Sequence, residues 1–262
     1  MATRRSGIHF HPIFKLGKHP VKRDERNFRF AALRRAAPKV PAVFDFDTTH
    51  RGIPTPMFLN DQLGDCVMAG RAHQTLRFED LEQKSVIPIR DAEVRREYLK
   101  ETGGRDTGLV VLDSLNLWRR RGWVAAKRRY YIKAFTQLDL RDHAQLKLSV
   151  FFATGAGIGT TLPKAALAQF QAGQPWTVVV GPKGRPDPHL GHYVYVCGYN
   201  TTGPVCITWG RKQQMTWAWY DKYVDEAYSI IDKKDLKRVG KVLDVGRLHR
   251  ALTTVSAPRR RA

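Results

Sequence analysis

Long apolar runs are absent from this 262-residue chain. No stretch approaches the ~18 consecutive apolar residues that a membrane-spanning helix requires. The first residues also lack the apolar core of a secretory signal. We therefore expect no membrane partner and a cytoplasmic location.

Cysteine is scarce as well. Cys66, Cys197 and Cys206 are an odd number, too few for a disulfide framework, so we expect free thiols. Zinc spacing of the Cys-x-x-Cys type is missing, and in an alternating strand His192 and Cys197 would point to opposite faces. The glycines at 155–159 are not followed by the lysine of a phosphate-binding loop. We accordingly predict neither a metal nor another cofactor.

Acidic residues are the third shortage, because 45 Lys and Arg face only 24 Asp and Glu, for a net charge of +21. Residues 1–51 hold 12 basic against 4 acidic residues and residues 233–262 hold 10 against 2, so each end carries +8. We predict a basic, proline-containing extended arm at 1–51, a domain at 52–232, and a basic extension at 233–262. Such arms favour acidic protein surfaces or nucleic acid as partners, although a general need for solubility would also explain them.

A separate basic segment lies within the central domain, at residues 118–133. It could be a nucleic-acid surface on which Tyr130 or Tyr131 stacks on bases. It could equally be a helix end and a strand whose basic side chains cover packed aromatic rings. The candidate polyanion-binding residues are Arg119, Arg120, Arg121, Lys127, Arg128 and Arg129.

The hydrophobic periodicity of the domain changes near residue 142, which predicts an α+β protein. A helical lobe over about 60–140 should precede an antiparallel β lobe over about 145–232. Predicted helices begin at Cys66 and cover 91–101, 109–121, 163–171, 217–225 and 235–252. Predicted strands cover 149–154, 176–180, 192–199, 205–209 and 227–231, with a hairpin turn at 200–204.

Cys66 and His192 are the most informative pair of residues. Cys66 follows Gly64 and Asp65 at the start of a predicted helix, where the helix dipole stabilises a thiolate. His192 follows Gly191 and opens an alternating apolar strand. A thiol and an imidazole in these settings are the two halves of a nucleophile–base site. We assign Asp65 to capping the helix.

These segments, together with Thr208, Trp209 and Gly210 after the hairpin, resemble the papain-like cysteine peptidase superfamily. The pattern is similar to uncharacterised papain-like proteins of bacteria and phages, and its Asp-Cys pair to the leader peptidases of bacterial exporters. The resemblance covers about 55–232. It implies a two-lobed fold and a peptide or protein substrate, with a place in the virion if a phage encodes the chain.

The resemblance also implies residue roles. Cys66 would be the nucleophile and His192 the general base and acid. Asn60, six residues before the cysteine, would help to hold the oxyanion, with Gln62 as the reserve. Where the family has Asn or Asp to orient the histidine, this chain has Thr208, whose hydroxyl is a weaker acceptor, and Trp209 would shield that contact from water.

Two functions of different class remain open at this level. One is a thiol hydrolase that cuts peptide or amide bonds through the Cys66–His192 dyad, and it could be weakly active. The other is an inactive papain-like scaffold that acts as a structural or interaction protein in a phage particle or another nucleic-acid-containing assembly. An open groove beside the dyad would favour the enzyme, whereas a filled groove would favour the scaffold.

Overall fold

The computed structural model describes residues 14–35, 38–248 and 250. Its helices are α1 (Phe30–Leu33), α2 (Phe46–Thr49), α3 (Cys66–Gln83), α4 (Asp91–Glu101), α5 (Val111–Arg121), α6 (His143–Phe152), α7 (Lys164–Gln171), α8 (Trp217–Tyr223) and α9 (Leu236–Val239). Its strands are β1 (Phe44–Asp45), β2 (Trp123–Ala125), β3 (Arg128–Tyr130), β4 (Ala134–Gln137), β5 (Ala156–Pro163), β6 (Pro186–Tyr199), β7 (Pro204–Thr208), β8 (Arg211–Gln214) and β9 (Val224–Ile231).

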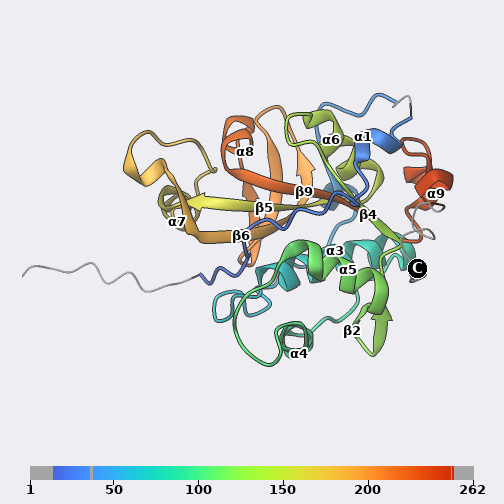
Figure 1. The fold of residues 1–262 in the computed structure, drawn as a ribbon, viewed down its shortest axis with the longest axis horizontal. Coiled ribbons are helices and arrows are strands. Elements are labelled where there is room, and N and C mark those ends of the chain that lie inside the picture. Colours follow the sequence, from blue (N-terminus) through green and yellow to red (C-terminus); the bar gives the residue numbers. More distant parts are fainter. Residues whose placement is uncertain (1–13, 36–37, 249, 251–262) are drawn as a thin grey trace, which may run out of the picture.

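An antiparallel sheet forms the centre of the molecule. Its strands lie in the order β4, β9, β5, β6, β7, β8, and β1 pairs with the end of β6. In Figure 1, α3, α4, α5 and β2 lie below this sheet, while α6 and α8 lie above it. The predicted α+β class, with a helical lobe first and an antiparallel β lobe second, is confirmed.

Strand β6 separates two hydrophobic cores, because its side chains alternate between the two faces of the sheet. Val194 and Val196 pack into the core beneath α6 and α8. Tyr193 packs into the core of the helical lobe. The predicted alternation of this strand is therefore confirmed, and the cysteine and histidine of interest lie where the two cores meet.

Helix α3 packs directly across β6. Its residues Met68, Ala72 and Leu76 recur at helical spacing and are fully buried, as predicted. Gly70 allows the close approach, since a Cβ atom at this position would lie 2.5 Å from a ring carbon of Tyr193. This contact fixes the position of α3, and of Cys66 at its start, relative to β6.

Several predicted elements are confirmed, and α4 has the predicted bounds of Asp91–Glu101. The strand expected at 149–154 is wrong, because 149–152 form the end of α6, and Asp142 caps the start of this helix by accepting a hydrogen bond from the Ala144 N–H. A helix buried on most sides shows no distinctive period, so its apolar run is read as a strand. The strand expected at 176–180 is also wrong: only Trp176 makes a bridge, to Met215.

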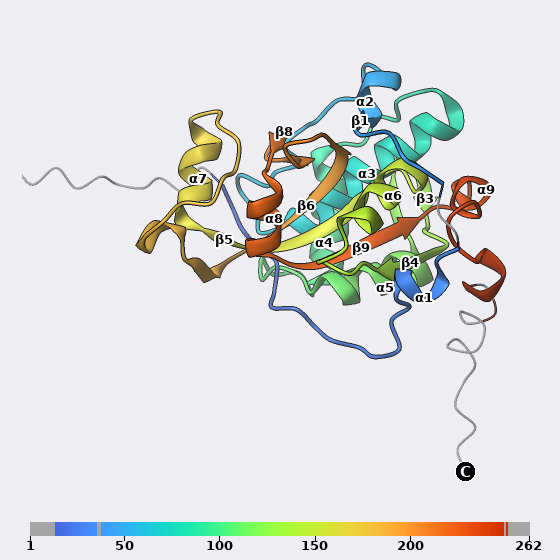
Figure 2. The same ribbon diagram turned by 90° about the horizontal axis from the view of Figure 1, so that it is seen from above.

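Both basic ends pack on the domain within the described residues. Residues 14–28 cross the molecule without regular structure, as the blue segment of Figure 2 shows. At the other end, Val239, Val242 and Leu243 are buried in the core of the β lobe. The helix expected at 235–252 is interrupted, because α9 ends at Val239 and a second helical stretch starts only at 245. Residues 1–13 and 251–262 of the predicted arms lie outside the described residues.

No helix in the described part of the chain is long and apolar enough to cross a membrane.

Substituting Gly70 tests the contact between α3 and β6. We expect Gly70→Ala to lower the free energy of unfolding by about 1 to 3 kcal/mol, because the added methyl group must displace the Tyr193 ring. Gly246→Ala is the control, since its Cβ would meet no atom nearer than 3.4 Å in a helical stretch. Urea unfolding measures both variants. An unchanged Gly70→Ala midpoint would contradict the tight packing.

Candidate active site

Cys66 is the first residue of α3 and is almost fully buried. The start of the helix is fixed by the Asp65 carbonyl, which accepts hydrogen bonds from the N–H groups of Met68 and Ala69. Cys66 therefore lies in the first turn of a helix, as predicted. The positive end of the α3 dipole lies at this sulfur.

The capping role expected for the Asp65 side chain is wrong. Asp65 occupies the N-cap position, but its carboxylate makes no capping hydrogen bond. Its ψ of 19° lies outside the extended region from which a capping side chain reaches the first N–H groups. The carboxyl is instead completely buried, and burial raises its pKa to about 8. Asp65 is therefore largely neutral at pH 7.

His192 lies on β6 and is held on two sides. Its Nε2 is 2.6 Å from Oγ1 of Thr208, the last residue of β7. The Trp209 ring stacks on the imidazole, with 4.2 Å between centroids and 12° between planes. Trp209 takes a positive φ of 43°, an uncommon backbone conformation that turns the ring over the histidine. Nδ1 of His192 is buried and has no hydrogen-bond partner in the described part of the chain.

The two lobes bring Cys66 next to the strand of His192. The backbone N–H groups of Tyr193, the residue after His192, and of Gly17 face the sulfur and favour its thiolate. Burial outweighs both and raises the pKa of the Cys66 thiol to about 11. Burial, and to a lesser degree the charge of Lys18, lowers the pKa of His192 to about 3. Both groups are therefore neutral at pH 7 in this state.

An N-terminal strap, residues 14–20, fills the seam between the lobes at this point. The Lys18 N–H donates to the Gly191 carbonyl of β6 at 3.2 Å. On the other side, the Leu109 N–H donates to the Gly17 carbonyl at 2.7 Å and the His19 N–H to the Leu109 carbonyl at 3.0 Å. The strap is thus an extended segment that lies between the two lobes. One of its edges bonds to β6 and the other to the helical lobe.

Gly17 passes over the turn that precedes Cys66 at very short range. A Cβ atom at Gly17 would lie 1.7 Å from the carbonyl oxygen of Gly64, which is backbone and cannot give way easily. Only glycine fits at this point of the strap. Because the backbone of Gly17 also faces the sulfur of Cys66, the strap contributes to the burial of this thiol.

Asn60 and Gln62, the two oxyanion candidates, are in different settings. Asn60 is buried, and its amide donates to the carbonyls of Leu63 at 3.2 Å and Lys15 at 3.4 Å. The Trp209 indole N–H donates to the same Lys15 carbonyl at 3.3 Å. Gln62 is exposed. The Asn60 amide and the Trp209 indole N–H therefore both donate to one peptide carbonyl of the strap, whereas the exposed Gln62 side chain makes no hydrogen bond in the described part of the chain.

We compared the sequence and the fold of the chain with those of known proteins. No protein-family model and no curated protein sequence matches the chain. Among solved structures, xylellain, a cysteine protease from Xylella fastidiosa, is similar with a TM-score of 0.63 and 15% identity, over 88% of this chain and 99% of that one. Procathepsin B from Trypanosoma congolense gives 0.55 and 13%, over 83% and 86%. The Carica candamarcensis cysteine protease CMS1MS2 gives 0.54 and 12%, over 74% and 99%.

The chain has the papain-like fold. The predicted resemblance is thus confirmed for the fold, and the order of its lobes agrees with it. A likeness at these identities does not carry activity from one protein to another. The more specific relation to bacterial or phage proteins stays a prediction.

One cluster of possible metal ligands occurs among the described residues of this papain-like domain: Asp45, Asp47 and Cys197. Lys212 places its Nζ 2.7 Å from Asp45 and 3.0 Å from Asp47. Arg77 forms a further ion pair with Asp47 at 2.7 Å. Because two cationic side chains already neutralise the carboxylates, the cluster does not fit a metal ion.

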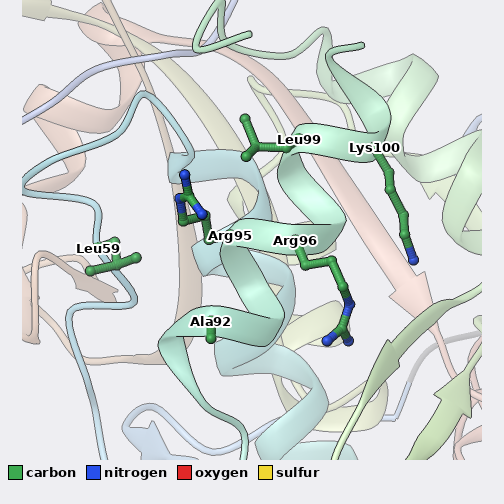
Figure 3. A pocket seen from close by; sticks show the side chains of 6 residues that line it. All are labelled: Leu59, Ala92, Arg95, Arg96, Leu99 and Lys100. Carbon is green, nitrogen blue, oxygen red and sulfur yellow. The ribbon is translucent and has the colours of Figure 1, made fainter. Parts of the chain in front are cut away.

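A hollow of about 530 Å³ lies along α4, and neither Cys66 nor His192 is among the residues that line it. Figure 3 shows Arg95 extending between Leu59 and the helix, while Arg96 and Lys100 leave the opposite side of α4. None of the lining residues is a nucleophile, a carboxylate or an imidazole. The hollow is therefore not part of the candidate active site.

The predicted polyanion-binding residues gather where α5 ends and the hairpin β2–β3 begins. Arg120, Arg121, Lys127, Arg128 and Arg129 are exposed. Tyr130 is buried and cannot stack on a base, whereas Tyr131 is half exposed. Arg119 is partly buried, and burial followed by the neighbouring charge of Arg120 lowers its pKa.

Removing the strap from Cys66 should activate the thiol. We expect Gly17→Ala to expel the strap and to raise the rate of iodoacetamide alkylation of Cys66 at pH 7 by about tenfold or more, because each unit by which the thiol pKa falls gives about tenfold more thiolate. In the unsubstituted chain the rate should climb steadily between pH 7 and 10, since the pKa of Cys66 is about 11. Intact-mass spectrometry with peptide mapping measures the rates.

Cys197 and Cys206 are internal references in the same experiment. Burial raises the pKa of Cys197 to about 12 and that of Cys206 well above its usual value. Neither has a hydrogen bond or charge interaction with residues 14–20 in the described part of the chain, so their alkylation should not change in Gly17→Ala, and Gly246→Ala should leave all three thiols as slow as before. Equal labelling of the three thiols in Gly17→Ala would contradict a special environment at Cys66.

Proposed function

We propose that this chain is a papain-like thiol hydrolase of peptide or amide bonds, held closed by its own strap. The observation that carries the proposal is the setting of His192. Its Nε2 is engaged by Thr208, its ring is fixed by Trp209, and its Nδ1 is left without a partner in the described residues, beside the strand residue that faces Cys66. A general base needs this combination of a fixed ring and one free nitrogen.

The chemistry follows from these positions once a substrate peptide replaces the strap. Nδ1 of His192 takes the proton of the Cys66 thiol, and the thiolate sulfur bonds to the carbonyl carbon. The carbon–nitrogen bond then breaks, and the imidazolium returns its proton to the leaving amine. Water, deprotonated by His192, hydrolyses the thioester and restores the thiol. Thr208 accepts a hydrogen bond from the Nε2–H of His192 throughout and so fixes the tautomer.

Asn60 is suited to the negative oxygen that forms in this reaction. Its amide already donates to the carbonyl of Lys15, so a peptide oxygen fits beside it. Together with the Cys66 N–H it would supply two donors to the oxyanion. Gln62 is left without a role because its side chain is exposed.

A filled seam was expected to favour a scaffold, but the identity of the occupant alters that inference. The strap belongs to the same chain, and its bonds to Gly191 and Leu109 are backbone hydrogen bonds, which a substrate peptide can replace one for one. Two of the similar proteins are named as proforms, the procathepsin B and the ragweed protease Amb a 11. A strap that closes the site explains why the Cys66 thiol is buried while the His192 ring is held in place by Thr208 and Trp209.

Hydrolysis of fluorescein-labelled casein tests the proposal. We expect slow or undetectable cleavage by the unsubstituted chain and measurable cleavage by Gly17→Ala, because only the open seam admits a substrate. Adding Cys66→Ala or His192→Ala to Gly17→Ala should abolish cleavage. Adding Thr208→Val should lower kcat by at least about tenfold with little change in KM, whereas Thr208→Asn should retain more activity, because an amide can still orient the imidazole.

The alkylation data decide how a negative result is read. If Cys66 of the Gly17→Ala variant is alkylated rapidly but casein is not cleaved, the proposal that the chain hydrolyses proteins is refuted. Cys66 would then be a reactive thiol without that activity. Cleavage that survives Cys66→Ala would identify a contaminating protease.

A second candidate function is a polyanion-binding interaction protein, with or without catalysis. The observation that favours it is the surface formed by Arg119, Arg120, Arg121, Lys127, Arg128 and Arg129, hereafter the α5–hairpin surface. None of the six pairs with a carboxylate within the residues described. The Arg96 guanidinium donates to the Val124 carbonyl at 3.0 Å, so the basic side of α4 continues this surface. Unpaired, adjacent positive charges are the pattern that phosphate groups neutralise.

Charge reversal on this surface tests the second candidate. The triple variant Arg120→Glu, Arg121→Glu, Lys127→Glu should weaken binding to a 30-base-pair DNA duplex. It should also lower the slope of log affinity against log salt by roughly one for each phosphate that is no longer neutralised. The control reverses three exposed lysines elsewhere, Lys84, Lys183 and Lys222, for the same change in net charge. Equal losses of affinity in both triple variants, measured by fluorescence anisotropy, would exclude a defined surface.

A further inference from the structure

Lys18 is the deepest side chain of the strap, and its charged end is paired inside the β lobe. The side chain is 1% exposed. Its Nζ lies 3.0 Å from Oδ1 of Asp225, 3.1 Å from Oδ2 of the same residue and 3.5 Å from Oε1 of Glu226. A further contact goes to the carbonyl of His19 at 3.3 Å. A buried lysine costs much free energy unless its charge is matched in this way.

The two carboxylates are held in place by other residues and aimed at the lysine. Thr161 donates to Oδ2 of Asp225 at 2.7 Å, and Tyr228 donates to Oε2 of Glu226 at 3.0 Å. The remaining oxygens, Oδ1 of Asp225 and Oε1 of Glu226, face Nζ of Lys18 and accept no hydrogen bond from any other residue in the described part of the chain. Lys18 is the only cation paired with these two carboxylates in the same part of the chain. Without Lys18, two carboxylates would face an empty pocket.

The shape of the pocket suits one long side chain. Gly159 on β5 leaves the space that the lysine stem fills, since a Cβ atom there would lie 2.2 Å from Cε of Lys18. Glu226 closes the inner end with a side chain that is 1% exposed, whereas Asp225 is 27% exposed at the outer end. The outer carboxylate therefore leaves room for a longer arginine as well as for lysine.

The backbone of Lys18 lies where a substrate backbone would have to lie. It bonds to Gly191, directly before His192, and its neighbours bond to Leu109 of the helical lobe. The charge of Lys18 is close enough to affect the pKa values of both Cys66 and His192. These backbone bonds are indifferent to sequence, so any discrimination among peptides at this position has to come from the side-chain pocket.

We propose that the pocket formed by Gly159, Asp225 and Glu226 is a specificity site that selects a lysine or arginine side chain of a peptide bound beside Cys66. The cleavage of such a peptide rests on the proposed function, but its binding does not. Lys18 is then the internal occupant of the pocket, and a basic substrate must displace it. Peptides with an acidic residue at this position are excluded by the two carboxylates.

A structural anchor for the strap is the competing explanation of the same contacts. It would hold Lys18 without accepting other peptides. The two explanations differ in one observable, which is whether an unrelated peptide gains affinity from a basic residue.

The binding of peptides distinguishes the specificity site from a structural anchor. It is measured on the full chain with the three substitutions Gly17→Ala, Lys18→Met and Cys66→Ala. The probes are fluorescein-labelled heptapeptides that copy residues 14–20, with lysine, arginine or norleucine in place of Lys18, and a second set with scrambled flanking residues. In fluorescence anisotropy, the lysine and arginine peptides should bind at least about tenfold more tightly than the norleucine peptide in both sets. Adding Asp225→Asn and Glu226→Gln should bring the ratio close to one.

The ratio is insensitive to general damage, because a weakened fold lowers the affinity of all peptides together. Asp221→Asn, which removes an exposed carboxylate on α8, is the control and should keep the preference. If the triple variant does not fold, Lys18→Met with Cys66→Ala alone carries the same comparison. Equal affinity for lysine and norleucine, a preference confined to the unscrambled set, or no binding by any peptide would each overturn the proposal. No hydrolysis is measured, so an inactive enzyme could still bear it out.

Discussion

The packing of α3 across β6 is the contact on which the arrangement of the site depends. It joins the two cores of the molecule, and it sets the start of the helix, with Cys66, against the strand that carries His192. Gly70 makes the approach short enough for the Tyr193 ring and backbone to face α3 directly. The hairpin partner of the same strand, β7, then delivers Thr208 to the imidazole. One helix–strand contact and one strand pairing thus assemble residues that are far apart in sequence.

Burial decides the chemical state of these residues. The helix dipole and two backbone N–H groups favour the thiolate of Cys66, but burial outweighs them and leaves a neutral thiol. The same burial keeps His192 neutral and Asp65 protonated. The closed seam therefore keeps the Cys66 thiol and the His192 imidazole uncharged, and Asp225 and Glu226 match the charge of Lys18, which the strap carries into the β lobe.

Local sequence signals were reliable where one physical requirement acted alone. The helix predicted over 91–101 is α4, and the alternation of 192–199 predicted the two faces of β6. They failed where packing overrode them. The apolar residues 149–152 belong to the buried helix α6, and residues 156–163 form the central strand β5 although Gly157 and Gly159 disfavour a strand. Gly157 and Gly159 are there because Tyr193 and Lys18 occupy the space above them.

The sequence by itself determined the papain-like order of lobes, the candidate pair Cys66 and His192, and Thr208 in the orienting position, because each depends on residue type and spacing along the chain. Only the tertiary structure decided that Asp65 is buried without capping the helix, that Asn60 and not Gln62 meets a peptide carbonyl, and that residues 14–20 occupy the seam. The physical reason is that burial and long-range hydrogen bonds join segments with no local sequence signal for each other. Lys18 and Asp225, more than two hundred residues apart, became partners only when the chain folded.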